Sequence, residues 1–150
     1  MPSSWTQNFY HAVFSTKDRV EFINPDLEER LYPFIGGIAR DLRCTLYAIN
    51  GMPDHLHVLI RYPSELSHSN MLQHIKGRSS KWIHETFPTL ARFSWQVGYG
   101  GFTVSKSVVP AVESYIARQK ERHAKQSFAD ELFELLRLHG VDFDPDDVLR

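Results

Sequence analysis

Cysteine is almost missing from this chain of 150 residues, in which Cys44 is the single thiol. One thiol excludes an internal disulfide and any zinc module built from several cysteines. The chain also lacks an apolar run approaching the roughly 18 residues that span a membrane, and its opening residues, MPSSWTQNFYH, lack the charged-then-apolar layout of a signal peptide. We therefore expect a soluble cytoplasmic protein with no membrane partner, in which any metal ion is held by ligands other than cysteine.

Repeats, low-complexity segments and linkers rich in glycine, proline or serine are missing as well. At this length, a chain without such linkers most simply folds as one domain around one core. The sequence therefore predicts a single domain over residues 1–150, in which residues 127–150 form an acidic C-terminal helical extension.

The net charge of −1 is unevenly distributed along the chain. Residues 127–150 hold seven acidic residues against two arginines, a charge of −5, which leaves +4 for residues 1–126. Within that first part, residues 73–84 carry three cations and no anion, and residues 115–126 carry four cations and one anion. Clustered cations beside aromatic residues fit a polyanionic partner, although runs of this size are also typical of solvated helix faces.

The first half of the chain predicts a strand, a helix and a strand pair. An aromatic-rich strand is expected at residues 5–14, and a helix follows with Asn24 as its N-cap and apolar residues at helical spacing to Leu42. Pro33 is expected to kink or restart this helix. Two apolar runs, 44–49 and 55–62, flank a turn-rich connection and predict an antiparallel pair.

The second half continues this alternation of helices and strands. We expect a helix at 67–84, strands at 93–97 and 102–106, and a helix from Pro110 to about residue 125. A last helix follows Ser127, with Asp130 as its capping partner and Gly140 as its stop. The order of elements predicts a ferredoxin-like α+β fold, with an antiparallel sheet, helices on one face and an added C-terminal helix.

Two histidines interrupt the apolar run at 55–62. In a strand, His55 and His57 point to the same side, about 6.5 to 7 Å apart, so the two imidazoles can share one metal ion. Hydrogen-bonded histidines at a sheet surface are the alternative, and a His-x-His pattern alone does not separate the two.

A tyrosine and a glutamine four residues apart lie on one face of the helix predicted from Pro110. Tyr115 could act as a nucleophile, because a tyrosine joined to phosphorus preserves the bond energy of a phosphodiester. The amide oxygen of Gln119 could complete a His-His-Gln metal site. Tyr115 taken alone is more typical of a packed or surface aromatic residue than of a nucleophile.

Five blocks follow one another along nearly the entire chain: HLH preceded by Pro-Asp, HIKGRSSKWI at 74–83, WQVGYGGFTVS at 95–105, YIARQ at 115–119, and SFADELFELLRLHGVDFD at 127–144. In order and spacing they resemble the HUH single-tyrosine transposases of small bacterial insertion sequences, the insertion-sequence 200-like family. A bare HUH tripeptide is unspecific, whereas five blocks in order are not. The resemblance implies that residues 1–150 form one HUH transposase domain.

The same resemblance implies a chemistry and a substrate. Such transposases bind single-stranded DNA that folds into imperfect hairpins at the element ends, and they cut it with Mg²⁺ or Mn²⁺. By the matching motifs, His55 and His57 are metal ligands, Gln119 is the third ligand, and Tyr115 is the nucleophile. Tyr115 would leave a 5′-phosphotyrosine and a free 3′-hydroxyl, which later attacks the other junction and reseals the DNA. A homodimer, in which the tyrosine helix of one subunit can serve the other, is implied as well.

Three residues near these motifs keep open roles. The family often has two histidines in a row after the tyrosine helix, whereas His123 is followed here by Ala124, which puts a ligand role for His123 in doubt. Asp54 either orients a histidine or shapes the turn, and His11 either lies near the site or only packs. The metal is open too, since imidazole favours zinc-like ions whereas amide oxygen and water favour Mg²⁺ or Mn²⁺.

Candidate contacts to DNA lie near two of the blocks. In the block at 74–83, five residues look like phosphate contacts for the hairpin: Lys76, Arg78, Ser79, Ser80 and Lys81. Arg118, Lys120 and Arg122 flank the tyrosine and could hold backbone phosphates. Solvated surface is the alternative for each of them taken alone.

Two other functions stay open. A catalytically silent or domesticated descendant would bind single-stranded DNA or RNA hairpins without cutting them. A metal hydrolase of small substrates would leave Tyr115 and its basic neighbours unexplained. Covalent protein–DNA adducts separate the three, because only the transposase forms them.

Overall fold

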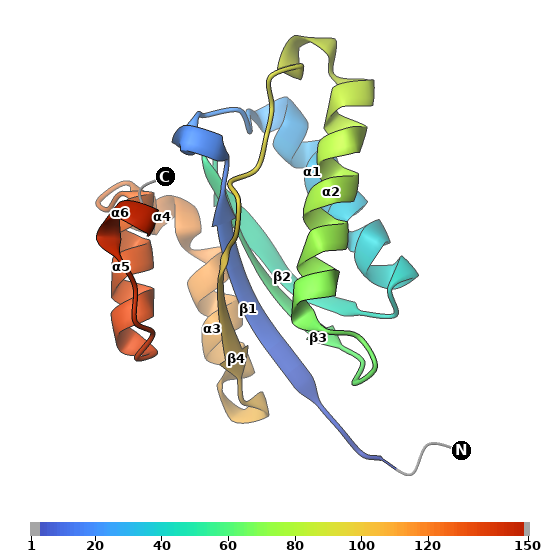
Figure 1. Cartoon of the computed structure of the whole chain (residues 1–150), viewed down its shortest axis with the longest axis vertical. Helices are drawn as coiled ribbons and strands as arrows, with labels where there is room; N and C mark the ends of the chain where they lie inside the picture. Colours follow the sequence, from blue (N-terminus) through green and yellow to red (C-terminus); the bar gives the residue numbers. More distant parts are fainter. Residues whose placement is uncertain (1–3, 149–150) are drawn as a thin grey trace.

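Four strands form one antiparallel sheet in the computed structural model, which describes residues 4–148 (Figure 1). The strands are β1 (Asn8–Ser15), β2 (Thr45–Met52), β3 (His55–Tyr62) and β4 (Gly100–Val104). Their order in the sheet is β2-β3-β1-β4, so β1 and β3 are the central strands. The α+β class and the ferredoxin-like order are confirmed. Residues 1–3 and 149–150 of the predicted domain lie outside the described part.

Helices cover both faces of the sheet, as Figure 1 shows. They are α1 (Pro25–Asp41), α2 (His68–Thr86), α3 (Val109–Ala117), α4 (Gln119–His123), α5 (Phe128–Leu138) and α6 (Pro145–Val148), joined by short 3-10 turns η1 (Lys17–Arg19), η2 (Pro88–Leu90) and η3 (Lys106–Val108). The expectation of helices on one face describes α1 and α2, whereas α3 and α5 lie on the opposite side. The reason lies in β3, whose residues 55–60 are buried on both faces and therefore need cover on each.

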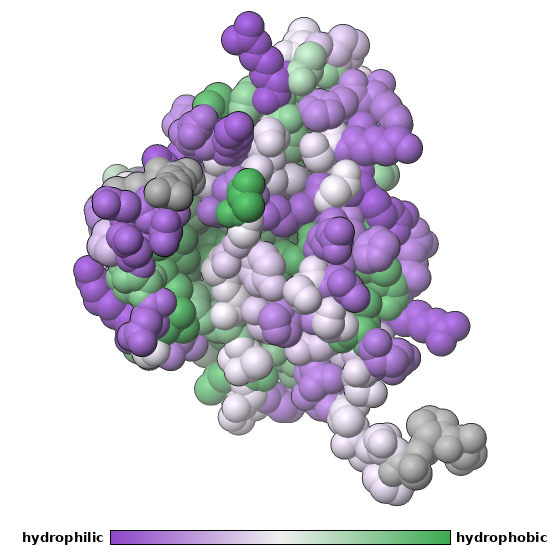
Figure 2. All heavy atoms as spheres, in the orientation of Figure 1, coloured by the Kyte–Doolittle hydropathy of each residue, from purple (hydrophilic) through white to green (hydrophobic). Residues whose placement is uncertain are grey.

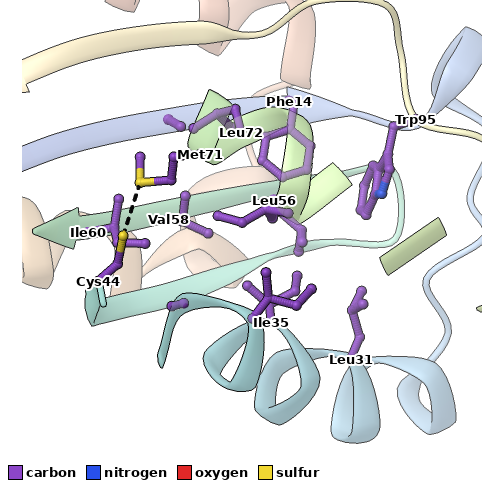
Figure 3. Close-up of a cluster of buried hydrophobic side chains, with 14 of the residues drawn as sticks. Phe14, Leu31, Ile35, Cys44, Leu56, Val58, Ile60, Met71, Leu72 and Trp95 are labelled. Carbon is purple, nitrogen blue, oxygen red and sulfur yellow. Dashed lines mark hydrogen bonds between the residues drawn. The ribbon is translucent and has the colours of Figure 1, made fainter. Parts of the chain in front are cut away.

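The main core lies between the sheet and the α1–α2 layer (Figure 3). Phe14, Leu56 and Val58 point from the strands toward this layer and are fully buried. Apolar residues at helical spacing meet them from α1 and α2, among them Leu31, Ile35, Met71 and Leu72. The opposite face holds two smaller clusters, in which α3 and α5 cover β1 and β3. The functional side chains lie on this second face.

Phe14→Ala is expected to lower the free energy of unfolding by about 3–5 kcal/mol, because it removes a fully buried aromatic ring from the main core. The Phe14 ring packs edge-on against Trp95, with ring centroids 4.9 Å apart, so a cavity would remain. Urea unfolding of the full chain measures the loss, with Val97→Ala as a control because Val97 is 100% exposed. A loss below about 1 kcal/mol would contradict this view of the core.

Most helix boundaries follow from the capping residues found in the sequence. The side chain of Asn24 accepts a hydrogen bond from the Leu27 backbone N–H at 2.9 Å, and that of Ser127 accepts one from Asp130 at 3.2 Å. Gly140 has a φ of 67° just after α5, which suits a glycine that ends a helix. Pro33 does not restart α1, which runs from residue 25 to residue 41 without a break.

Two predicted elements differ from the structure. Residues 93–97 form no strand, because Trp95 turns into the core and makes only an isolated bridge with Thr16. The helix expected from residue 110 to residue 125 breaks at Arg118, where φ is −97° and ψ is 18°. There the Asn50 side chain donates to the carbonyls of Ile116 and Ala117, at 3.0 and 3.2 Å, and so satisfies carbonyls at the end of α3.

Figure 2 shows one face of the molecule, on which hydrophilic side chains are widespread and apolar ones form small groups. Between residues 4 and 148, no helix has the length and apolar character needed to cross a membrane.

Candidate active site

Strand β3 places two imidazoles under α3 on the second face of the sheet. His55 and His57 have no exposed surface, and their ring centroids lie 5.3 Å apart. The buried His11 on the neighbouring strand β1 brings its Nε2 to 2.8 Å from Nδ1 of His57. Asp54 at the hairpin turn brings its Oδ1 to 2.7 Å from Nδ1 of His55. Asp54 thus orients a histidine, and His11 is part of the site rather than a distant packing residue.

The break after α3 brings the tyrosine and the glutamine to the same place. The Tyr115 ring centroid lies 5.8 Å from that of His57, within the same chain. Gln119 is fully buried, and its Oε1 lies 3.2 Å from Nε2 of His55. The structure therefore brings together all four residues that the motifs predicted for chemistry, although Tyr115 and Gln119 do not share one continuous helix.

Glu131 on α5 lies in the site, and the sequence analysis missed it. It is 1% exposed, and its Oε1 lies 3.0 Å from Nε2 of His57. Its Oε2 accepts hydrogen bonds from the Tyr115 hydroxyl and, at 2.8 Å, from the Gln119 amide. The signal was its place on the apolar face of the helix, beside Phe128 and Leu135 at helical spacing, where a carboxylate needs a partner.

His123 at the end of α4 completes the cluster. Its Nε2 lies 2.8 Å from Oε1 of Glu131, and its Nδ1 lies 2.6 Å from the carbonyl oxygen of Gln126. Ligand atoms of His55, His57, His123 and Glu131 all lie within 4.8 Å of one another. Imidazole nitrogens and a carboxylate oxygen are common ligands of divalent transition metals, so the donor set fits a metal site.

Burial and close contacts shift the pKa values of this cluster in different directions. Burial opposes ionisation of Glu131, but hydrogen bonds to His123, His55 and His57 outweigh it and hold the carboxyl pKa well below its usual range. Burial, together with the hydrogen bond and charge of Glu131, raises the pKa of the Tyr115 hydroxyl. The Tyr115 hydroxyl is therefore protonated at neutral pH and donates a hydrogen bond to the ionised Glu131 carboxylate.

Acid is expected to destabilise the metal-free protein through two buried histidines. Burial lowers the pKa of His57 to about 4, and burial together with the nearby His57 lowers the pKa of His11 to about 3. In both histidines the pKa of the folded state lies below that of the unfolded state. They therefore do not lower the free energy of unfolding above about pH 6.5, and stability is lost as the pH falls from there toward 4. The loss is about 1.4 kcal/mol per pH unit for each histidine that stays neutral.

The variant His11→Gln tests this, because glutamine keeps a hydrogen-bonding side chain but does not titrate. Urea unfolding in EDTA at pH 7.5, 6.5 and 5.5 should give a pH dependence shallower by up to one proton than that of the wild type. Parallel profiles for the two proteins would show that His11 takes up its proton in the folded state.

The predicted DNA contacts on α2 lie on the face of the sheet opposite the site. Ser79 is fully buried and accepts a hydrogen bond from Trp95 at 3.0 Å, so its side chain does not reach the surface. Lys76 is half-buried and donates to the carbonyls of Gln96 and Gly98, at 2.7 and 2.5 Å. These two side chains hold the segment before β4 against α2.

The remaining candidates on α2 are nearer the surface. Arg78 pairs with Asp41 at 2.7 Å, and Lys81 lies 3.9 Å from Glu85 one turn along the helix. Ser80 is half-buried. Their contact with DNA stays a prediction, and it would be made away from Tyr115.

Cations beside Tyr115 line an open pocket of about 620 Å³. Arg122 lies over the tyrosine ring, 4.5 Å from its centroid, and Arg118 and Lys125 line the same pocket. Lys120 points away from it and binds Glu28 on α1 at 2.8 Å. Arg118 and Arg122 thus place positive charge beside Tyr115, whereas Lys120 ties α4 to α1 through Glu28 and to β2 through the Gly51 carbonyl.

Comparison with known proteins identifies a family whose matched range includes most of this site. Residues 4–119, more than half of the chain, match the family model described as transposase IS200 like. The chain belongs to the IS200-like transposase family. The matched range contains His55, His57, Tyr115 and Gln119, and it ends before His123 and α5.

Two curated relatives carry transposase names. The transposase for insertion sequence element IS200 of Salmonella typhimurium is 26% identical over 117 residues, covering 75% of this chain and 76% of that protein. The ISDra2 transposase TnpA of Deinococcus radiodurans is 22% identical over 118 residues, covering 75% of this chain and 84% of that protein.

Two solved structures share the fold of this family member. A transposase crystal structure from Deinococcus radiodurans R1 matches with a TM-score of 0.66 at 23% identity, over 79% of this chain and 95% of that one. A REP-associated tyrosine transposase bound to a REP hairpin matches with a TM-score of 0.63 at 16% identity. That match covers 97% of this chain and 88% of the other, so it includes the C-terminal segment.

Proposed function

We propose that this protein is a DNA transposase that cuts and rejoins single-stranded DNA through a 5′-phosphotyrosine on Tyr115, with hairpins at the element ends as its substrate. The observation that carries the proposal is the convergence of the Tyr115 hydroxyl with the buried pair His55 and His57 in one chain of an IS200-like transposase. The solved relative bound to a REP hairpin supports a hairpin as the partner.

The side chains divide the reaction between them. The hydroxyl oxygen of Tyr115 attacks the scissile phosphorus while the bond from phosphorus to the 3′-oxygen breaks, and the 3′-oxygen takes up a proton from solvent water. The hydroxyl proton passes to Oε2 of Glu131, which already accepts its hydrogen bond. Arg118 and Arg122 hold the neighbouring phosphates beside the tyrosine. The free 3′-hydroxyl later reverses the step at the other junction, because the phosphodiester energy is kept in the tyrosine ester.

His55 and His57, with Oε1 of Gln119, would hold a divalent cation, Mg²⁺ or Mn²⁺, in this proposal. A cation there supplies Lewis-acid polarisation of a phosphoryl oxygen. Asp54 and His11 hold the two imidazoles in orientation through their Nδ1 atoms.

The homodimer stays a prediction. Because Tyr115 lies at the histidine pair of its own chain, cleavage by a monomer needs no tyrosine from a second subunit. Light scattering at micromolar concentration distinguishes the two, since a mass near 17.4 kDa indicates a monomer.

The proposal is tested with the full chain and labelled oligonucleotides copied from palindromes that flank its gene. With Mn²⁺, a single-stranded hairpin substrate should give a slower band on a denaturing gel, formed by the protein–DNA ester. The band should be missing with EDTA and with the same sequence as a perfect duplex. Tight hairpin binding without any covalent species would favour the catalytically silent binder instead.

A further inference from the structure

Two rings of the site have their Nδ1 atoms committed to oxygen acceptors. Nδ1 of His55 lies 2.7 Å from the Asp54 carboxylate, and Nδ1 of His123 lies 2.6 Å from the Gln126 carbonyl. Carboxylate and carbonyl oxygens only accept hydrogen bonds, so each Nδ1 carries the proton. In a neutral ring, Nε2 then carries a lone pair, which points away from the Asp54 carboxylate or the Gln126 carbonyl.

When Nε2 of either ring is protonated, it donates to Glu131, and this is the hydrogen bond that lowers the carboxyl pKa. When the rings are neutral, both lone pairs point at oxygen atoms that only accept hydrogen bonds. Nε2 of His123 lies 2.8 Å from Oε1 of Glu131, and Nε2 of His55 lies 3.5 Å from the same oxygen. Gln119 donates its amide N–H to Oε2 of Glu131, which leaves its Oε1 facing His55 at 3.2 Å. Buried acceptors that face one another need a positive charge between them. A proton on one ring satisfies only that ring and one oxygen. A divalent cation between the acceptors binds both imidazole nitrogens and the facing oxygens at once.

We propose that His123 and Glu131, which lie beyond the family-matched range, are further ligands of this divalent cation and hold it together with His55, His57 and Oε1 of Gln119. The inference rests on the proposed function only in placing the cation at the transposase site. Three imidazole nitrogens and one carboxylate oxygen favour Mn²⁺ and zinc-like ions over Mg²⁺, which prefers oxygen ligands and its own water. Asp54 and the Gln126 carbonyl are the outer partners that fix the two rings.

The same carboxylate connects the cation site to the nucleophile. Oε1 of Glu131 faces the imidazoles, while Oε2 accepts from the Tyr115 hydroxyl and the Gln119 amide. Glu131 therefore acts as a positioning residue for Tyr115 as well as a ligand. Since α5 carries it, the acidic C-terminal segment is part of the site rather than an appended helix.

Titration calorimetry on the EDTA-treated and dialysed full chain tests the ligand set, with MnCl₂, ZnCl₂ and MgCl₂ as separate titrants. The wild type should bind one Mn²⁺ or Zn²⁺ per chain, at least about ten-fold more tightly than Mg²⁺. Glu131→Gln and His123→Ala should each weaken Mn²⁺ binding by about ten-fold or more. Asp130→Asn, an exposed acid-to-amide change on the same helix, should bind as the wild type does.

Wild-type affinity for Mn²⁺ in both Glu131→Gln and His123→Ala would overturn the ligand set. Faster adduct formation by a Glu131→Gln variant with undiminished Mn²⁺ affinity would also overturn it, because the carboxylate would then block the site. If Glu131→Gln fails to fold, Glu131→Asp is the second variant. It keeps the negative charge, but its shorter side chain moves the carboxylate away from the imidazoles, so it should still bind Mn²⁺ more weakly than the wild type. Unchanged affinity in that variant counts equally against the proposal.

The outcomes separate this inference from the proposed function. Loss of Mn²⁺ in both variants, together with no hairpin adduct in the wild type, would leave the ligand set standing and remove the transposase chemistry. Hairpin adducts in the wild type and in both variants, with equal Mn²⁺ affinity, would leave the transposase chemistry standing and rule out His123 and Glu131 as ligands.

Discussion

Tyr115→Phe is expected to abolish the covalent protein–DNA adduct, with a loss of at least about a thousand-fold, because phenylalanine offers no oxygen to attack phosphorus. Hairpin binding should stay within about three-fold of the wild type, since Arg118 and Arg122 are kept beside the ring. The fold should persist as well, because Gln119 still donates to Oε2 of Glu131 after the hydroxyl is removed. A denaturing gel measures the adduct, and a filter-binding titration measures the affinity.

Tyr47→Phe is the matched control. Tyr47 also lies on the second face of the sheet, where it packs edge-on against Phe9 with ring centroids 5.1 Å apart. Removing its hydroxyl should leave adduct formation unchanged. Persistence of the adduct in Tyr115→Phe, or its loss in Tyr47→Phe, would assign the nucleophile to a different residue.

Gly51→Ala is expected to disrupt the hairpin that carries the histidines. Gly51 pairs with Leu56 across the β2–β3 hairpin, and a Cβ at this position would collide with the backbone carbonyl of His55. Backbone cannot move aside as the end of a flexible side chain does, so the strand must shift and carry His55 with it. We expect a loss of about 1–3 kcal/mol or more in the free energy of unfolding, measured with urea, and weaker Mn²⁺ binding by calorimetry.

Gly77→Ala provides the comparison for this change. Gly77 is an exposed residue of α2, and nothing lies within 4 Å of the Cβ that would be added. Alanine there should raise the free energy of unfolding by about 0.5–1 kcal/mol, since it favours the helix. If the two variants were equally stable, and both bound Mn²⁺ as the wild type does, the close approach at Gly51 would not control the site.

The sequence predicted the elements whose signals are local. Apolar periodicity and the caps Asn24 and Ser127 predicted the helices, and the apolar run at 55–62 beside a turn-rich connection predicted the strand that carries the histidine pair. The spacing of Tyr115 and Gln119 identified two residues of the site, because both return to the same place despite the break between them. Local pattern therefore predicted which residues of β3, α3 and α4 the structure brings together, and their chemical roles stay a prediction.

Features that depend on distant contacts could not be predicted. At the break at Arg118, the carbonyls of Ile116 and Ala117 accept hydrogen bonds from Asn50, which lies far away in the sequence. Ser79 was predicted to contact phosphate because it stands in a basic run, but its side chain is fully buried and accepts a hydrogen bond from Trp95. In the sequence, Glu131 is one of seven acidic residues in the C-terminal segment. Only the packing of α5 places it against His57 and Tyr115.

Anomalous diffraction from crystals of the full chain soaked in MnCl₂ is the most direct test of a cation held beside the nucleophile. One strong peak is expected at about 2.0–2.3 Å from Nε2 of His55 and of His57, on the side facing Tyr115. A data set with no peak near these two nitrogens, and full Mn²⁺ occupancy elsewhere in the protein, would contradict a metal-dependent site built on the histidine pair.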